Sequence, residues 1–225
     1  MQSHSTQIPS FDVIEKRVKV SQHELTILAV RDTNKLLEEI KVDDFNEDER
    51  LPYWAEIWPS SVALAEYLWL KDIKDKNILE LGCGVGLVGI AAALCGADVL
   101  MTDYEEDALR FAKQNVQKNF NQDKSNGKII VASLDWRTPK LSEKYDFIIG
   151  SDLLYEKRNH RPILKLINEY IKDNGEAVLT DPNRSTLNSF LKSAEDNNFY
   201  VQALYSSVEF NKKKFDIATI ILKKR

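Results

Sequence analysis

The chain of 225 residues is long enough for one large domain or two small ones, and its 43% apolar residues are enough for a buried core. Its formal net charge of −4 gives no basic excess to neutralise a phosphate backbone, so nucleic acid is not expected as a partner. Two cysteines and three histidines lack the spacing of a metal site, so no metal is expected.

The first ten residues lack the order of a signal peptide, and no apolar run approaches the roughly 20 residues that span a bilayer. We therefore expect a cytoplasmic protein with no membrane partner. Residues 17–20 and 25–30 alternate between apolar and polar like two short strands, which predicts an N-terminal β-hairpin. The acidic run at 43–49 is typical of a solvated linker. Residues 1–50 are thus expected to form a partly flexible extension, and residues 51–225 the main domain.

After Pro59, apolar residues recur at helical spacing, and from residue 77 onward strand-length apolar runs alternate with helical patterns. Strands are predicted at 78–81, 98–102, 128–132, 145–150 and 177–180, with helices at 87–94, 108–119, 161–171 and 186–197. Such alternation predicts a parallel sheet with helices on both faces.

The last part of the chain breaks this alternation. Two strands, at 200–210 and 215–222, follow one another across a short polar joint that permits only an antiparallel hairpin. We therefore predict an α/β fold: a Rossmann-like, seven-stranded mixed sheet with a C-terminal antiparallel hairpin, helices on both faces and a short N-terminal hairpin extension.

A glycine-rich turn follows the strand at 78–81 in the stretch ILELGCGVGLVG. Glycines at 82, 84 and 86 let the backbone turn tightly and approach a ligand closely. The helix after Gly86 would direct its free N–H groups at that ligand. Asp103 ends the next strand about 20 residues later, the interval expected for an acid that accepts ribose hydroxyls.

Glu80 precedes the first glycine of this turn by two residues. A carboxylate there would repel the pyrophosphate of a dinucleotide and attract the ammonium of a methionyl group. Glu80 therefore favours S-adenosyl-methionine over NAD as the ligand. The alternative is that Glu80 only accepts hydrogen bonds from the turn.

The ELGCGVG segment, Asp103 and the pair Asp135-Trp136 resemble the motifs of class I, seven-strand S-adenosyl-methionine-dependent methyltransferases, over roughly residues 50–225. More narrowly, WAEIWP at 54–59 and SDLLY at 151–155 are similar to the nicotinamide-N-methyltransferase-like group, which includes the family 16 protein-lysine methyltransferases.

The resemblance implies roles for individual residues. Backbone atoms of the glycine turn would contact the cofactor, Asp103 would hold the ribose, Trp136 would pack on the adenine, and Trp58 and Ser151 would lie beside the cofactor. Together with the turn residues and Glu80, the expected cofactor-binding set is Trp58, Glu80, Gly82, Cys83, Gly84, Gly86, Asp103, Asp135, Trp136 and Ser151.

Asp152 and Tyr155 are the expected catalytic residues, facing the methyl acceptor. The strand before them is apolar on both faces and so central, and residues just past its carboxyl end lie in the ligand crevice of an open α/β sheet. If 153–156 forms a helical turn, their spacing puts both side chains on one side. The alternatives are a helix N-cap for Asp152 and an ordinary half-buried tyrosine for Tyr155.

The leading hypothesis is an S-adenosyl-methionine-dependent N-methyltransferase whose partner is a protein lysine. A small-molecule amine or hydroxyl compound is the alternative acceptor. An NAD-dependent oxidoreductase and a cofactor-binding module without catalysis are the competing classes. The acceptor, the number of methyl groups and the oligomeric state do not follow from the sequence.

Overall fold

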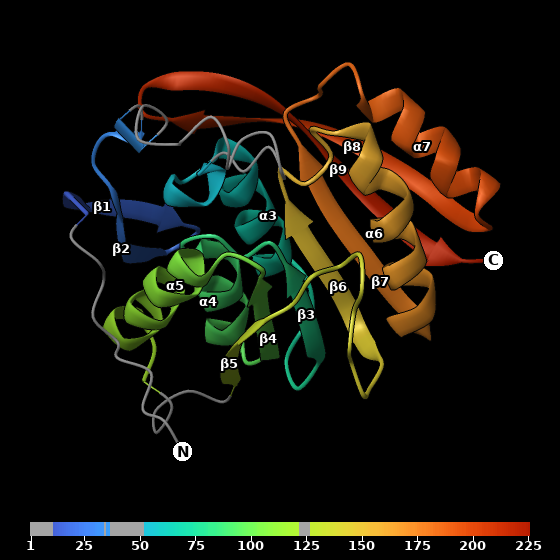
Figure 1. Cartoon of the computed structure of the whole chain (residues 1–225), viewed down its shortest axis with the longest axis horizontal. Helices are drawn as coiled ribbons and strands as arrows, with labels where there is room; N and C mark the ends of the chain where they lie inside the picture. Colours follow the sequence, from blue (N-terminus) through green and yellow to red (C-terminus); the bar gives the residue numbers. More distant parts are fainter. Residues whose placement is uncertain (1–10, 34, 37–51, 122–126) are drawn as a thin grey trace.

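The computed structural model describes residues 11–33, 35–36, 52–121 and 127–225, which are coloured along the chain in Figure 1. Seven strands form one sheet in the spatial order β5-β4-β3-β6-β7-β9-β8. Their bounds are β3 (Asn77–Leu81), β4 (Asp98–Asp103), β5 (Lys128–Ser133), β6 (Tyr145–Ser151), β7 (Ile171–Asp181), β8 (Phe199–Phe210) and β9 (Lys213–Lys224). The predicted seven-stranded mixed sheet is confirmed.

The direction of the chain through the sheet reverses beside β3. From β3 the chain crosses to β4 on one side, whereas β6 pairs in parallel with the other side of β3. A crevice opens at such a reversal, at the carboxyl ends of the strands. β9 pairs antiparallel with both β7 and β8, so the predicted C-terminal hairpin is also confirmed.

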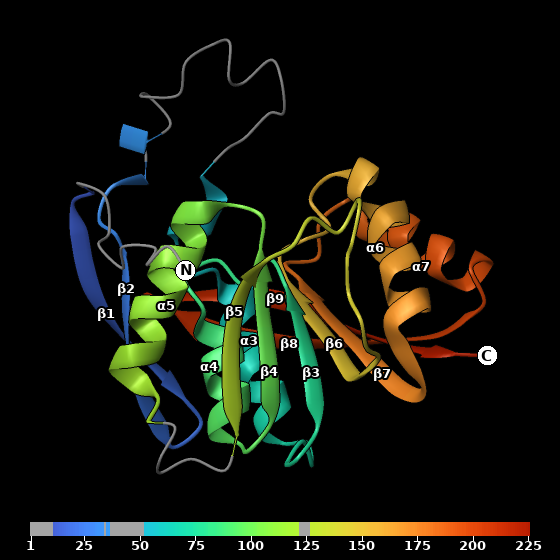
Figure 2. The ribbon, with the colours of Figure 1, turned by 60° about the horizontal axis from the view of Figure 1, so that its bottom comes forward.

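Helices cover both faces of the sheet, as predicted. Figure 2 shows α6 (Lys157–Tyr170) and α7 (Leu187–Asp196) on the opposite side from α5 (Glu106–Asn119) and the N-terminal hairpin. The helices α3 (Pro59–Trp69) and α4 (Leu87–Leu94) pack against each other on the α5 side. Nearly every side chain of α4 is buried, which explains why it is apolar all round rather than amphipathic.

Two predicted element starts after residue 77 differ from the structure by more than two residues. α6 begins at Lys157, four residues before the expected start, and carries Pro162 inside it. The sequence pattern favoured a later start because proline is usual in the first turn of a helix. β7 begins at Ile171, directly after α6, because a polar stretch that resembles a loop joins the strand, with a register irregularity opposite Tyr145 and Phe147.

None of the helices in the described ranges has both the length and the apolar character needed to cross a bilayer.

The predicted N-terminal hairpin is present and longer than expected. It consists of β1 (Val13–Val20) and β2 (His23–Val30), which pair antiparallel around a turn where Ser21 has φ +53°. Its apolar side chains join the same core as α3, α4 and α5. The linker predicted at 43–49 lies outside the described residues, so a domain boundary at residue 50 stays a prediction.

Two asparagine side chains on α5 hydrogen-bond to the backbone of β2, at the edge of the hairpin that does not pair with β1. The side-chain amide of Asn119 both accepts from and donates to the backbone of Thr26, at 2.8 Å each. Asn115 does the same with Leu28, at 2.7 and 3.0 Å. The amides therefore replace a neighbouring strand and satisfy an edge that would otherwise be open. Asn115 also donates to the carbonyl of Val85 at 2.9 Å, which ties the hairpin to the glycine turn.

Replacing Asn115 with Ala should lower the free energy of unfolding by about 1–3 kcal/mol, because the part-buried backbone groups of Leu28 and the buried carbonyl of Val85 lose their partners. Gln117→Ala, at an exposed position on the same helix, is the matched control and should change stability by no more than about 0.5 kcal/mol. Urea unfolding of the two variants measures the difference. Equal stabilities would contradict a supporting role for the asparagine amides.

Candidate active site

A cavity of about 360 Å³ lies in the crevice between the carboxyl ends of β3, β4 and β6, within the size range of small-ligand sites. Ten of the twelve predicted site residues line it: Trp58, Gly82, Cys83, Gly84, Asp103, Asp135, Trp136, Ser151, Asp152 and Tyr155. Because the carboxyl ends of parallel strands meet at one edge of the sheet, residues as far apart in the sequence as Gly82 and Tyr155 share this cavity.

The glycine turn forms one wall of the cavity with bare backbone. Gly82 and Gly84 have φ of +61° and +50°, the left-handed region that side chains rarely adopt. A Cβ on Gly82 would lie 2.6 Å from the side chain of Leu153, and one on Gly84 would lie 3.2 Å from the carbonyl oxygen of Trp54. The turn therefore requires glycine at both positions, for conformation and for space.

Asp103 reaches from the end of β4 to this turn. Its Oδ2 accepts the N–H of Gly84 and its Oδ1 accepts the N–H of Glu105, both at 3.0 Å. Burial raises the pKa of this carboxyl to about 6, although the two backbone hydrogen bonds oppose the shift. Each carboxylate oxygen has more than one lone pair, so Asp103 keeps capacity for a hydroxyl donor from a ligand.

Glu80 corrects the sequence analysis. Its side chain is only 2% exposed and is not among the residues that line the cavity. It points from β3 beneath the start of α4, where the Gly89 N–H hydrogen-bonds to it. Burial, with a smaller contribution from Asp103, raises its pKa to about 8, so the side chain is largely protonated at neutral pH. The expected anion facing the ligand is therefore wrong, and the alternative, a hydrogen bond from the glycine-rich segment, fits the structure.

Gly86 is the second residue that the structure keeps out of the cavity lining. With φ +90° it caps the start of α4 and packs behind the turn against Met101 and Ala112. Its N–H donates to the carbonyl of Cys83 at 2.8 Å. Gly86 shapes the turn from behind, while its neighbours Val85 and Leu87 still line the cavity.

The wall expected to hold the adenine comes from the segments after β4 and β5. Asp135 accepts hydrogen bonds from the backbone and the side chain of Arg137, at 2.8 and 2.9 Å. The Arg137 guanidinium lies over the ring of Tyr104, 5.8 Å from its centroid. Trp136 sits half-buried between these groups and the turn, since a Cβ on Gly82 would come within 3.6 Å of its ring.

An aromatic cluster of Tyr53, Trp58 and Tyr155 forms another wall. The Trp58 indole donates to the carbonyl of Tyr53 at 2.8 Å, and the Tyr53 ring meets those of Trp58 and Tyr155 edge-on, at centroid distances of 6.1 and 5.3 Å. The ring of Trp54 instead packs on Phe11 and Phe111 in the core. The Trp54 ring is therefore part of the core, although both Trp54 and Trp58 belong to the cavity lining.

Asp152 stands at the end of β6 with φ +58°, a region that aspartate tolerates better than most residues. Its side chain is 10% exposed, and Oδ1 lies 2.6 Å from Nη2 of Arg184. Burial raises the pKa of Asp152, and the Arg184 charge opposes this shift. Asp152 is not a helix cap, because α6 begins five residues later with Glu156 at its cap position.

Tyr155 lies on a turn rather than on the helical turn that its spacing suggested, yet its side chain still joins Asp152 in the cavity. The turn is fixed by Leu154, whose carbonyl accepts the Thr186 hydroxyl at 2.9 Å and lies 3.2 Å from Nε2 of the buried His160. Burial raises the pKa of Tyr155 to about 12, so its hydroxyl stays protonated at neutral pH.

Several lining residues were not predicted from the sequence, among them Tyr53 and Arg184. Arg184 follows the end of β7 by three positions, so the strand-end rule that located Asp152 would have located it as well. Tyr53 precedes the Trp54 segment and had no signal of its own. Within the described ranges, no group of three or more His, Cys, Asp or Glu side chains could hold a metal ion.

Comparison with known proteins shows the family of the chain. The model of the lysine methyltransferase family matches residues 39–202, which is most of the sequence. The chain belongs to the lysine methyltransferase family. Two curated relatives are the protein N-lysine methyltransferase METTL21A of Danio rerio, 36% identical over 58% of this chain, and the histone-arginine methyltransferase METTL23 of Xenopus laevis, 37% identical over 50%. The matches span 61% and 49% of those relatives, so the chain covers less than two thirds of either one.

Solved structures support the fold of this family member. The magnesium protoporphyrin IX methyltransferase of Synechocystis, crystallised with bound SAM, has a TM-score of 0.59 to it at 19% identity. The alignment covers 81% of this chain and 86% of that one. At this identity the similarity shows the Rossmann-like methyltransferase fold alone.

The buried carboxyl of Glu80 should make the stability of this methyltransferase family member depend on pH. Above pH 6.5 the unfolded chain has released the Glu80 proton, whereas the folded chain keeps it until about pH 8, so stability should fall as pH rises through this window. The slope from this one group is at most about 1.4 kcal/mol per pH unit. Urea unfolding between pH 6.5 and 8 should show that Glu80→Gln removes this slope, while Glu66→Gln, at an exposed position on α3, keeps it.

Proposed function

We propose that the chain is an S-adenosyl-methionine-dependent methyltransferase that methylates the nitrogen of a lysine side chain in a protein. One observation carries the proposal: a single cavity joins the glycine turn and Asp103 to Asp152 and Tyr155. Cofactor-type and acceptor-type groups therefore face the same space, in a chain of the lysine methyltransferase family.

The residues present fit S-adenosyl-methionine. The bare backbone at Gly82 and Gly84 leaves room for close approach, Asp103 has acceptor capacity for ribose hydroxyls, and Trp136 offers an apolar face for the adenine. Glu80 is not part of this fit, so it gives no argument against NAD. When bound, the cofactor supplies a methyl group on a cationic sulfur, and the protein supplies position and electric field.

Asp152 would capture and orient the protonated amine of the acceptor. A carboxylate favours the charged ammonium, but the reacting nitrogen must be neutral, and free lysine has a pKa near 10.4. The ion pair with Arg184 reduces this conflict, because it offsets part of the Asp152 charge. The amine proton then leaves to solvent, and the protonated hydroxyl of Tyr155 aims the nitrogen and limits the space around it.

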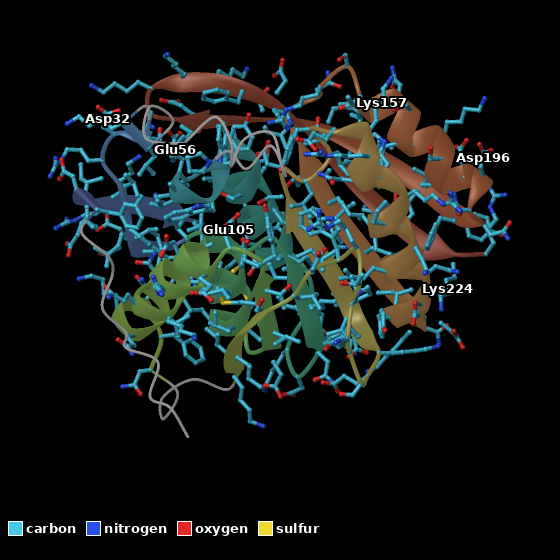
Figure 3. All side chains as sticks on the ribbon, in the orientation of Figure 1. Asp32, Glu56, Glu105, Lys157, Asp196 and Lys224 are labelled. Carbon is cyan, nitrogen blue, oxygen red and sulfur yellow. The ribbon has the colours of Figure 1, made fainter. Side chains whose placement is uncertain are left out.

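The charge of the cavity supports a cationic acceptor. Six carboxylates but only three guanidinium groups line it, and Figure 3 labels two of these acids, Glu56 before α3 and Glu105 after β4. Such an excess attracts a lysine-bearing segment, whereas a neutral hydroxyl compound would gain nothing from it. The full set is Glu56, Asp103, Glu105, Asp135, Asp152 and Glu156 against Arg137, Arg158 and Arg184.

A cytoplasmic location is part of the proposal. The two cysteines, Cys83 and Cys95, are both free thiols in the structure, which suits a reducing compartment.

Calorimetric titration should show that S-adenosyl-methionine binds and NAD does not. Between pH 7 and 5 the charges of the methionyl tail stay constant, so affinity should fall about tenfold per pH unit below about pH 6 as Asp103 takes up a proton. Asp103→Asn should bind more weakly at pH 7 and lose this pH dependence. Tight binding of NAD, with S-adenosyl-methionine excluded, would refute the proposed function.

Asp152→Asn should strongly reduce methyl transfer to a low residual rate while calorimetry still detects S-adenosyl-methionine binding, because the substitution removes the charge that orients the amine and keeps the side-chain shape. The assay incubates the enzyme with radiolabelled cofactor and a lysate of the source organism, then hydrolyses the labelled fraction. Methyl-lysine in a polypeptide supports the proposal. Label only in methyl-arginine or in small molecules would reassign the acceptor, and full turnover by Asp152→Asn would remove Asp152 from the mechanism.

A further inference from the structure

Arg184 is fixed by a buried carboxylate on the strand next to Asp152. Its backbone N–H donates to Oδ1 of Asp181 at 2.7 Å, and its Nη1 donates to Oδ2 of the same residue at 3.0 Å. The side chain of Asp181 is 0% exposed, at the end of β7. Both the main chain and the side chain of Arg184 are therefore anchored at one point.

The other end of the guanidinium reaches Asp152. Nη2 lies 2.6 Å from Oδ1 of Asp152, and the backbone N–H of Asp152 donates to the carbonyl of Thr180 at 2.9 Å. The end of β7 thus restrains both the main chain and the side chain of Asp152. A planar guanidinium can contact two carboxylates at fixed angles, which the single ammonium of a lysine cannot.

The restrained carboxylate keeps bonding capacity for a ligand. Both oxygens of Asp152 are buried at the cavity wall, with the Arg184 guanidinium and the Ser60 hydroxyl against them, and among the described residues neither oxygen has a hydrogen bond of good geometry. Two carboxylates and one guanidinium leave this cluster with one net negative charge. That charge matches the single positive charge of a lysine ammonium.

We propose that Arg184 is a positioning residue for methyl transfer: held by Asp181, it fixes the Asp152 carboxylate that orients the acceptor amine. The inference rests on the proposed function. Arg184 acts through Asp152 and contributes no group to the reacting atoms. A guanidinium held from two sides fixes the orientation of the Asp152 carboxylate at the cavity wall, so its loss should harm transfer rather than cofactor binding.

The cluster also sets how transfer depends on pH. The charged groups that face Asp152 are Arg184 and Asp181 from the end of β7, and the hydroxyl of Ser60 lies on the α3 side. Burial raises the pKa of Asp152, and Arg184 restrains that rise. Removing the guanidinium should therefore shift the acidic limb of the rate profile to higher pH, an effect that a merely structural residue would not produce.

The test measures Arg184→Ala, Arg184→Lys, Asp152→Asn and the double variant Arg184→Ala/Asp152→Asn. Arg161→Ala, at an exposed position on α6 outside the cavity, is the matched control. Three quantities are measured for each: the Kd for S-adenosyl-methionine by calorimetry, the thermal midpoint, and transfer of radiolabel from saturating cofactor to source-organism lysate between pH 6 and 9.

Arg184→Ala should lose about 100-fold in transfer rate, as expected for a misplaced orienting group, with its Kd within about twofold of the wild type. Its acidic limb should move to higher pH. The double variant should be no slower than the slower single variant, because both substitutions break one unit. Arg184→Lys should keep the fold and recover only part of the rate, and it decides the question if Arg184→Ala does not fold.

Three results would overturn the inference. A Kd that weakens as much as transfer would make Arg184 a cofactor-binding residue. Losses that multiply in the double variant would mean that Arg184 and Asp152 act independently. An Arg184→Lys variant with wild-type rate and pH profile would show that a guanidinium in contact with both carboxylates is not needed. A wild type that neither binds S-adenosyl-methionine nor transfers label would instead refute the proposed function, and the inference with it.

Discussion

The cavity depends on one hydrogen-bonded contact between neighbouring parallel strands, the carboxylate of Asp103 against the N–H of Gly84. The turn after β3 has left-handed glycines, and β4 also holds it through the Cys83 N–H, which donates to the carbonyl of Thr102 at 2.8 Å. Asp103 anchors the turn from β4 while remaining at the cavity wall. The same group therefore shapes the turn and faces the ligand, which explains why a carboxylate is kept in a setting that raises its pKa.

Most of the architecture follows from patterns that the sequence carries openly. Alternating strand and helix patterns define the parallel part of the sheet, and the short polar joint before β9 permits only a hairpin. The boundaries that differ have local causes. Pro162 resembles a helix start but lies within α6, and the polar first half of β7 pairs with β6 although its composition resembles a loop.

The site was predictable wherever position alone decides which side chains meet. Residues just past the ends of parallel strands share one crevice, so Asp103 and Asp152 could be placed there from spacing, whereas Trp136 was implied by the family resemblance. The prediction for Glu80 was wrong because this residue lies within β3, where the alternation of side chains along the strand places its carboxyl under α4. The sequence does not show how deeply that carboxyl is buried. Arg184 could be found by the same rule, but its pairing with Asp152 depends on the shape of the loop after β7.

The asparagine contacts of α5 connect the N-terminal hairpin to the cavity as well as holding it in place. Asn115 binds the hairpin at Leu28 through both its Oδ1 and its Nδ2, and the same Nδ2 also donates to Val85 in the wall of the cavity. Two regions that share a bonding partner are thermodynamically linked, and such linkage is reciprocal. Whatever stiffens the wall also steadies the hairpin, so a molecule that grips the hairpin from outside could tune occupancy of the cavity without ever entering it.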